Sequence, residues 1–150
     1  MHDISKPWSG VRVMNHLAGR YKHNSHCKGM LKAHLIFVTR FRKRILTHER
    51  AGDVKQYLYD TANSHGWKIH AMETDKDHVH ILIQYKPTDS ISKIVKALKQ
   101  ESTYQMWQRH SVYMNKIYWY QKTLWSKGYF YASIGEVSDA AIRKYIENQG

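Results

Sequence analysis

Alternating apolar and polar residues predict strands at two places near the middle of the chain. The first strand covers residues 31–39 and the second covers residues 78–85. Alternate side chains of a strand share one face, so the second strand has two unlike faces. One face carries His78, His80, Leu82 and Gln84, and the other carries Val79, Ile81, Ile83 and Tyr85. Two imidazoles are therefore expected side by side where this strand begins.

Helical periodicity predicts three helices. The first covers about residues 49–64, and Gly66 closes it. The second follows the N-cap residue Ser90, and its apolar face is formed by Ile91, Ile94, Val95 and Leu98. The third covers residues 139–149 and follows the N-cap residue Ser138. We expect these helices to back a sheet.

Two further strands and one extension complete the predicted organisation. Residues 67–74 are expected to form an antiparallel hairpin with the histidine strand, and residues 128–134 form the last strand. A length of 150 residues suits one domain. Residues 1–29 lack sustained periodicity, which predicts a flexible or loosely packed N-terminal extension. Residues 30–150 are then expected to form one folded domain.

The charge of the chain indicates a nucleic-acid partner. Twenty-four Lys and Arg residues against 12 Asp and Glu residues leave a net charge of +12, which attracts phosphate backbones. The chain also has 11 Tyr, five Trp and three Phe residues. Aromatic rings among cations are typical of proteins that bind single strands, where unpaired bases stack on the rings. Composition thus selects a class of ligand without selecting a reaction.

Cysteine usage and hydropathy indicate a cytoplasmic location. Cys27 is the single cysteine, so no internal disulfide and no structural thiolate cluster can form, which fits a reducing compartment. No apolar stretch reaches the length of a membrane span, and the first residues lack the apolar segment of a signal peptide. Any metal site would therefore use His, Gln or carboxylate ligands.

Two pairs of residues carry candidate chemistry. His78 and His80 are close enough to share a divalent cation, but the same spacing fits two outward polar residues of a half-solvated strand. On the last helix, Tyr145 and Gln149 lie one above the other. A phenol beside Lys144 suits attack on a phosphodiester, but Tyr145 also suits packing on an amphipathic helix. Only the combination with His78 and His80 favours a chemical role for Tyr145.

A family resemblance joins these two pairs. It is carried by LKAHLIFVTRFRKRIL (31–46), ETDKDHVHILIQY (73–85), the helix around IVKALK (94–99), LWSKGYFYASIG (124–135) and IRKYIENQ (142–149). In these stretches, which span about 120 of the 150 residues, the chain resembles the single-tyrosine HUH transposases of minimal insertion sequences, the TnpA type, including relatives associated with REP elements. The pairing of His-x-His with a later Tyr-x-x-x-Gln is the specific part of the pattern.

The resemblance implies a fold and a reaction. The fold would be α+β, with an antiparallel sheet backed by helices, of the ferredoxin-like or RNA-recognition-module-like HUH endonuclease type. The predicted order of elements is compatible with it. Tyr145 would be the nucleophile, while His78, His80 and Gln149 would bind Mg²⁺ or Mn²⁺. Attack would leave a 5′-phosphotyrosine and a free 3′-hydroxyl, and the reverse step would rejoin strands.

The resemblance also implies partners. The substrate would be single-stranded DNA hairpins at the ends of an insertion sequence. The protein would be a homodimer in which the tyrosine helix of one subunit can complete the site of the other. It would work in the cytoplasm of a prokaryotic cell, at the nucleoid. DNA contacts are expected from the basic residues Arg40, Arg42, Lys43, Arg44, Lys93, Lys96 and Lys99.

Other functions fit parts of the pattern. A nonenzymatic single-stranded nucleic-acid-binding protein of RNA-recognition fold would stack bases on exposed sheet aromatics, and its two histidines would be incidental. Such a protein would form no covalent adduct and need no metal. A domesticated relative would cut repeated hairpins without moving as an element. A histidine-triad phosphoesterase does not fit, because Leu82 stands where a third histidine belongs.

Overall fold

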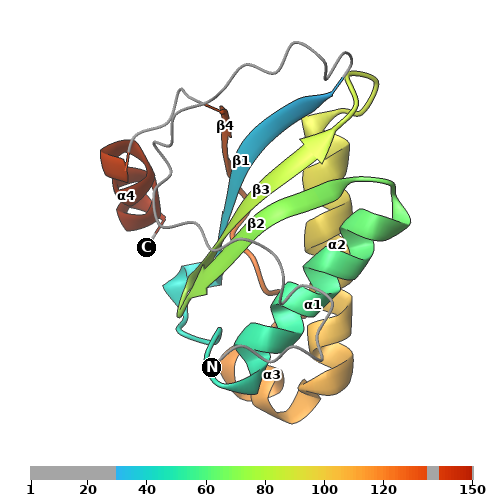
Figure 1. Ribbon diagram of the computed structural model, residues 1–150. Helices are drawn as coiled ribbons and strands as arrows, with labels where there is room; N and C mark the ends of the chain where they lie inside the picture. The colour runs from blue at the N-terminus through green and yellow to red at the C-terminus, as the bar shows by residue number, and fades with distance from the viewer. Residues whose placement is uncertain (1–29, 135–138, 150) are drawn as a thin grey trace.

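A computed structural model describes residues 30–134 and 139–149 and shows one antiparallel sheet with helices against both faces (Figure 1). The strand order is β2-β3-β1-β4. The strands are β1 (Leu31–Val38), β2 (Lys68–Asp75), β3 (His78–Tyr85) and β4 (Phe130–Ser133). The helices are α1 (Glu49–Ser64), α2 (Ile91–Arg109), α3 (Ser111–Ile117) and α4 (Asp139–Asn148), and a 3-10 turn, η2 (Arg40–Arg42), follows β1. This arrangement confirms the predicted α+β fold.

The predicted elements recur with small differences in their bounds. α1 and β3 match their predicted ranges, and Gly66 follows α1 with a φ of 79°. The sequence pattern does not predict α3, because Met114 is the one buried residue of this short helix and no apolar stripe forms. His110 separates α3 from α2 through a non-helical backbone with φ −120° and ψ 38°. The segment between α2 and β4 therefore contains a helix that periodicity could not reveal.

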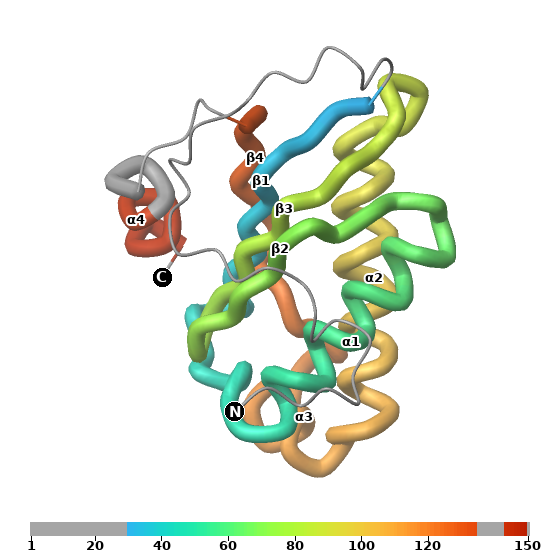
Figure 2. The backbone as a smooth tube through the Cα atoms, in the orientation of Figure 1, coloured from blue at the N-terminus to red at the C-terminus, as the bar shows by residue number. Residues whose placement is uncertain are grey.

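Two clusters of buried side chains occupy the two faces of the sheet. The larger cluster lies under α1 and α2 and includes Leu35, Phe37 and Ile81 from the sheet. The smaller cluster joins Ile36 and Val38 of β1 to Phe130, Ala132, Tyr145 and Ile146. α4 thus covers part of the face opposite α1 and α2, as the backbone tube shows (Figure 2).

Replacing Leu58 with alanine is expected to lower the free energy of unfolding by about 2–5 kcal/mol, because it leaves a cavity in the core. Leu58 of α1 is fully buried in the larger cluster. Leu31→Ala is the matched control, since Leu31 is 45% exposed and should change stability by less than about 1 kcal/mol. Urea denaturation followed by circular dichroism measures both variants. Equal losses would contradict this assignment of the core.

Among the helices described within residues 30–134 and 139–149, none combines the length and the hydropathy that a membrane span requires. The predicted N-terminal extension, residues 1–29, and the predicted N-cap Ser138 lie outside the described residues. The domain boundary at residue 30 therefore stays a prediction.

Candidate active site

The two histidines of β3 stand side by side on the sheet face that α4 partly covers. Their ring centroids are 5.0 Å apart, and their ring planes are tilted by 38°. β3 pairs with β1 so that His80 lies opposite Ile36 and His78 lies opposite Val38. Both histidines are partly exposed, whereas their neighbours in the strand are buried. The shared face that the alternating pattern predicts is confirmed.

The Asp77 carboxylate orients the ring of His78. Asp77 Oδ1 lies 2.7 Å from His78 Nδ1, and Arg42 Nε donates to Asp77 Oδ2 at 3.2 Å. Burial raises the pKa of the Asp77 carboxyl, but hydrogen bonds from His78 and Arg42 outweigh burial, and the pKa lies below its ordinary value. An ionised Asp77 favours the proton on Nδ1 of a neutral His78, which leaves a lone pair on Nε2. A metal-binding imidazole uses this tautomer.

Two carboxylates of β2 lie opposite the histidines. The register pairs Asp75 with His78 and Glu73 with His80, and paired residues of antiparallel strands share a face. Neither carboxylate was a predicted site residue, although a two-residue turn between the strands fixes this register. In the described part of the chain, no group of three or more His, Cys, Asp or Glu side chains could hold a metal ion. A metal site here needs another donor, such as an amide, water or a phosphate.

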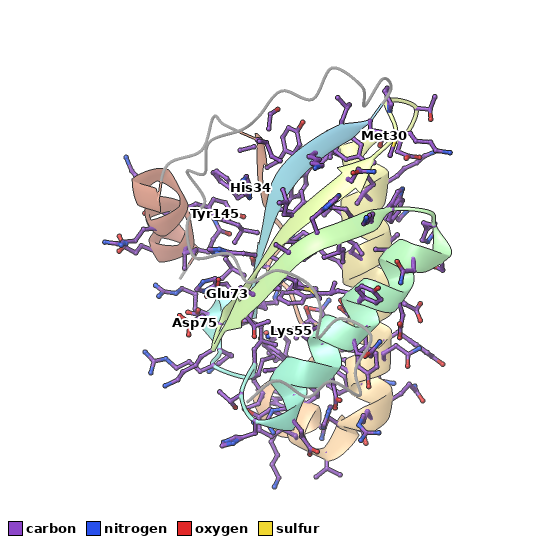
Figure 3. The ribbon with its side chains drawn as sticks, viewed as in Figure 1. Met30, His34, Lys55, Glu73, Asp75 and Tyr145 are labelled. Carbon is purple, nitrogen blue, oxygen red and sulfur yellow. The ribbon has the colours of Figure 1, made fainter. Side chains whose placement is uncertain are left out.

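The Tyr145 side chain extends from α4 toward the sheet (Figure 3). It lies on the face that carries His78 and His80, which we call the histidine face. Its ring lies 5.6 Å from the ring of Phe130 and packs against Ile36 and Val38, the β1 residues paired with the two histidines. The hydroxyl is buried and has no hydrogen-bond partner among the described residues. Burial raises the pKa of the Tyr145 phenol above its ordinary value. The phenol is therefore protonated at neutral pH.

Gly128 is the point where Tyr145 and Gln149 meet. A methyl group added to its Cα would lie 3.4 Å from the Tyr145 hydroxyl and 3.8 Å from Gln149 Oε1. Gln149 Oε1 also lies 3.5 Å from the hydroxyl of Ser126, which donates to the Val38 carbonyl at 3.0 Å. Val38 is paired with His78. The loop of residues 126–128 therefore connects the side-chain amide of Gln149 to the start of β3. The two predicted residues of α4 thus come together on the histidine face.

Lys99 of α2 also contacts the loop of residues 126–128. Its amino group donates to three successive carbonyl oxygens, at 2.8, 3.4 and 2.7 Å, those of Ser126, Lys127 and Gly128. Burial lowers the pKa of Lys99 to about 8. The sequence groups Lys99 with Lys93 and Lys96 as DNA contacts, but those two lysines are exposed and Lys99 is partly buried. The structure gives Lys99 a role in positioning the loop beside Tyr145.

The other predicted DNA contacts surround turn η2. Lys43 and Arg44 are exposed, while Arg42 pairs with Asp77. The guanidinium carbon of Arg40 lies 5.4 Å from the centroid of the Phe41 ring. The basic turn thus lies next to the carboxylate that orients His78. Contacts between these residues and DNA stay predictions.

Sequence comparison identifies relatives of this chain. It matches the family described as "Transposase IS200 like" over residues 27–149. It is 34% identical over 119 residues to the ISDra2 transposase TnpA of Deinococcus radiodurans, covering 79% of this chain and 84% of the relative. It is 24% identical over 131 residues to the transposase for insertion sequence element IS200 of Salmonella typhimurium, covering 87% of this chain and 84% of the relative. The family match includes both histidines and the last helix.

Two solved structures share the fold. A crystal structure at 1.90 Å of a protein of Deinococcus radiodurans R1, provisionally assigned as a transposase, superposes with a TM-score of 0.75 at 32% identity. The match covers 87% of this chain and 98% of that chain. The REP-associated tyrosine transposase bound to a REP hairpin superposes with a TM-score of 0.51 at 15% identity, covering 86% and 68%. Both likenesses agree with the predicted fold type.

Proposed function

Because the chain belongs to the IS200-like transposase family, as its sequence predicts, we propose that it cuts and rejoins single-stranded DNA through a covalent bond to Tyr145. The observation that carries this proposal is the meeting of Tyr145 and Gln149 at Gly128, on the sheet face that bears the histidine pair. A nucleophile and cation-binding side chains on one face are the parts that phosphoryl transfer requires.

The proposed reaction exchanges one phosphoester bond for another. The phenol oxygen of Tyr145 bonds to the scissile phosphorus, and the bond from phosphorus to the 3′ oxygen breaks. The phenol loses its proton, and the departing 3′ oxygen gains one. The products are a 5′-phosphotyrosine and a free 3′-hydroxyl. Attack by a 3′-hydroxyl reverses the step and releases Tyr145, so strand joining needs no nucleotide cofactor.

His78, His80 and Gln149 are the proposed ligands of Mg²⁺ or Mn²⁺. When bound, the cation withdraws charge from the scissile phosphate. The donor set supports this assignment, because the imidazole centroids are 5.0 Å apart and Asp77 favours the metal-binding tautomer of His78. Two ring nitrogens and one amide oxygen leave positions for water and phosphate oxygens.

The proposed substrate is a DNA hairpin from the end of an insertion sequence. A net charge of +12 suits a phosphate backbone, and one protein of the same fold is bound to a REP hairpin in its structure. We further propose a homodimer in which Tyr145 of one subunit can serve the histidines of its partner. Mixing Tyr145→Phe subunits with His80→Ala subunits tests this exchange. Recovered cleavage supports exchange between subunits, and absent cleavage argues against it.

A labelled hairpin from the DNA that flanks the gene tests the proposed reaction. With Mn²⁺ or Mg²⁺, we expect a protein–DNA adduct that survives denaturation in detergent, together with a released fragment that ends in a 3′-hydroxyl. A chelator should prevent both products. Tight binding of the strand without any adduct would instead support a nonenzymatic binding protein.

Replacing Asp77 with asparagine is expected to raise the metal concentration for half-maximal adduct formation by about 10–100-fold. The amide keeps the size of the side chain but accepts more weakly from His78 Nδ1, so the imidazole loses its fixed orientation. Saturating metal should restore most of the rate, because Asp77 acts through His78. Asp89→Asn, in the loop after β3, is the control and should leave the metal dependence unchanged. A low rate at saturating metal would contradict a positioning role.

A further inference from the structure

Three exposed aromatic rings gather beside turn η2. Phe41, Trp119 and Tyr120 are 54%, 76% and 47% exposed. The rings of Phe41 and Tyr120 have centroids 6.2 Å apart at 52°, and those of Trp119 and Tyr120 have centroids 5.6 Å apart at 81°. Neither pair is stacked face to face, so the rings do not cover one another's faces. We call these three residues the aromatic platform.

Hydrogen bonds fix the backbone of the two segments that carry the platform, η2 after β1 and the loop after α3. The hydroxyl of Tyr118, a fully buried residue, donates to the Arg40 carbonyl at 2.7 Å. The Arg40 amide donates to the Leu124 carbonyl at 2.9 Å, so the two loops are joined twice. Thr39 is fully buried, and its hydroxyl donates to the Lys43 carbonyl at 2.7 Å, which closes turn η2. The platform is therefore held in place before any ligand arrives, which reduces the entropic cost of binding.

The backbone at Phe41 indicates that the ring itself has a use. Phe41 has φ 59° and ψ 22°, and Arg42 has φ 51°, in the left-handed region that favours glycine. A bulky aromatic residue in this conformation is strained, and its ring is exposed rather than buried in a core. Strained residues cluster at binding and active sites, and at Phe41 the strain coincides with two neighbouring exposed rings.

Charge around the platform suits a nucleic-acid strand. The Arg40 guanidinium carbon lies 5.4 Å from the Phe41 ring centroid, and Lys43 and Arg44, which follow η2, are exposed. Arg42, next to Phe41, pairs with Asp77, which contacts His78. A strand on the platform would therefore lie close to the histidine pair, with cations beside its phosphates.

We propose that the aromatic platform stacks an unpaired base of the DNA strand that runs to the histidine pair, while Arg40, Lys43 and Arg44 contact the adjoining phosphates. The identity of the strand rests on the proposed function, but stacking does not require cleavage. Base stacking on rings is largely independent of sequence, so the platform would hold a strand without selecting its bases. The RNA-recognition alternative would stack bases on the sheet, whereas the platform lies on loops at its end.

Replacing Phe41 with glycine separates binding from stability. Glycine relieves the left-handed backbone, so the melting temperature should stay equal or rise, while loss of the ring should weaken strand binding roughly 5- to 100-fold. Phe41→Tyr should bind within about twofold of the unchanged protein, because the ring face remains. Fluorescence anisotropy with a labelled 12-nucleotide strand of mixed sequence, in EDTA and at fixed salt, measures affinity without cleavage.

Two controls match this change. His48→Gly also places glycine at a strained position, φ 53°, in an exposed residue, and should leave binding unchanged. Tyr104→Ala removes a ring that is 57% exposed on α2 and does not belong to the platform, and should also leave binding unchanged. An abasic strand of the same length keeps the phosphates and lacks the bases. It should bind the Phe41→Gly variant and the unchanged protein with equal affinity.

The outcomes are distinct. A Phe41→Gly variant that binds the mixed strand normally, or one that loses as much affinity for the abasic strand, overturns the stacking proposal. Weaker self-association in sedimentation with unchanged strand binding would also overturn it, since the platform would then be an interface between copies of the chain. Adduct formation at saturating DNA is measured separately. Adduct formation can fail while base stacking is intact, or persist while stacking is absent. Cleavage through Tyr145 and stacking on the platform are therefore tested independently.

Discussion

Replacing Tyr145 with phenylalanine should abolish the protein–DNA adduct and leave the fold intact. Phenylalanine lacks the oxygen that bonds to phosphorus, so adduct formation should fall at least about 10³-fold. The aromatic ring that packs against Phe130, Ile36 and Val38 is retained. The buried hydroxyl has no partner among the described residues, so removing it should keep or raise the free energy of unfolding, by up to about 1 kcal/mol. Gel analysis of the adduct and urea denaturation measure the two effects.

Binding and the remaining tyrosines provide the controls for this change. Strand affinity in EDTA should match that of the unchanged protein, because the Tyr145 hydroxyl is buried. Tyr129→Phe, Tyr131→Phe and Tyr120→Phe should each retain the adduct. Tyr131 shares a hydrogen bond with Tyr85 at 3.2 Å, and Tyr120 lies on a loop at the end of the sheet. An adduct that survives in the Tyr145→Phe variant would move the nucleophile to one of these three residues.

Local sequence patterns were sufficient to predict that His78 and His80 share one face of the sheet. Alternation along one strand placed His78 and His80 on the same side, and the short turn before them sets the register with β2. That register also places Glu73 and Asp75 opposite the histidines. The predicted strand ends at residue 74, one residue before the end of β2, so this pairing was not predicted. The side of a strand on which a residue lies is readable from the pleat, whereas the register also needs the correct turn length.

The lysines of α2 show how far a spacing of three residues keeps side chains on one helix face. Lys93, Lys96 and Lys99 are three residues apart, and a helix turns about 100° per residue, so each step shifts the position back by about 60°. Over two steps the stripe rotates by about 120°, which moves Lys99 from the exposed side toward the loop before β4. There its amino group donates to backbone carbonyls. Residues spaced three apart therefore share one helix face only over about two helical turns.

Contacts between distant segments could not be predicted. Tyr145 and Gln149 meet at Gly128 because α4 packs on the face of β1 and β4, and this docking depends on tertiary contacts of Ile36 and Val38. The sequence contained one signal, since an isolated glycine in a strand pattern often marks a close approach of another group. It could not identify that group. The aromatic platform was missed for the same reason, as its two loops are about 80 residues apart.

Replacing His80 or His78 with alanine should remove metal-dependent cleavage while the fold and strand binding persist. Each imidazole supplies one of few cation ligands, so adduct formation at millimolar Mn²⁺ should fall at least about 10²-fold. Both side chains are partly exposed, so truncation opens no large core cavity, and stability should change by less than about 1 kcal/mol. Titration calorimetry with Mn²⁺ should detect binding to the unchanged protein and weakened binding to each variant.

His70→Ala is the matched control for this pair. His70 is a partly exposed histidine of the same sheet whose Nε2 lies 2.8 Å from Gln84 Oε1, and it has no proposed part in the metal site. We expect His70→Ala to cleave and to bind Mn²⁺ like the unchanged protein. Equal losses in His70→Ala and His80→Ala would indicate a general effect on the sheet. Full activity in both His78→Ala and His80→Ala would remove the histidine pair from the reaction, because no cation held by these rings could then be acting on the phosphate.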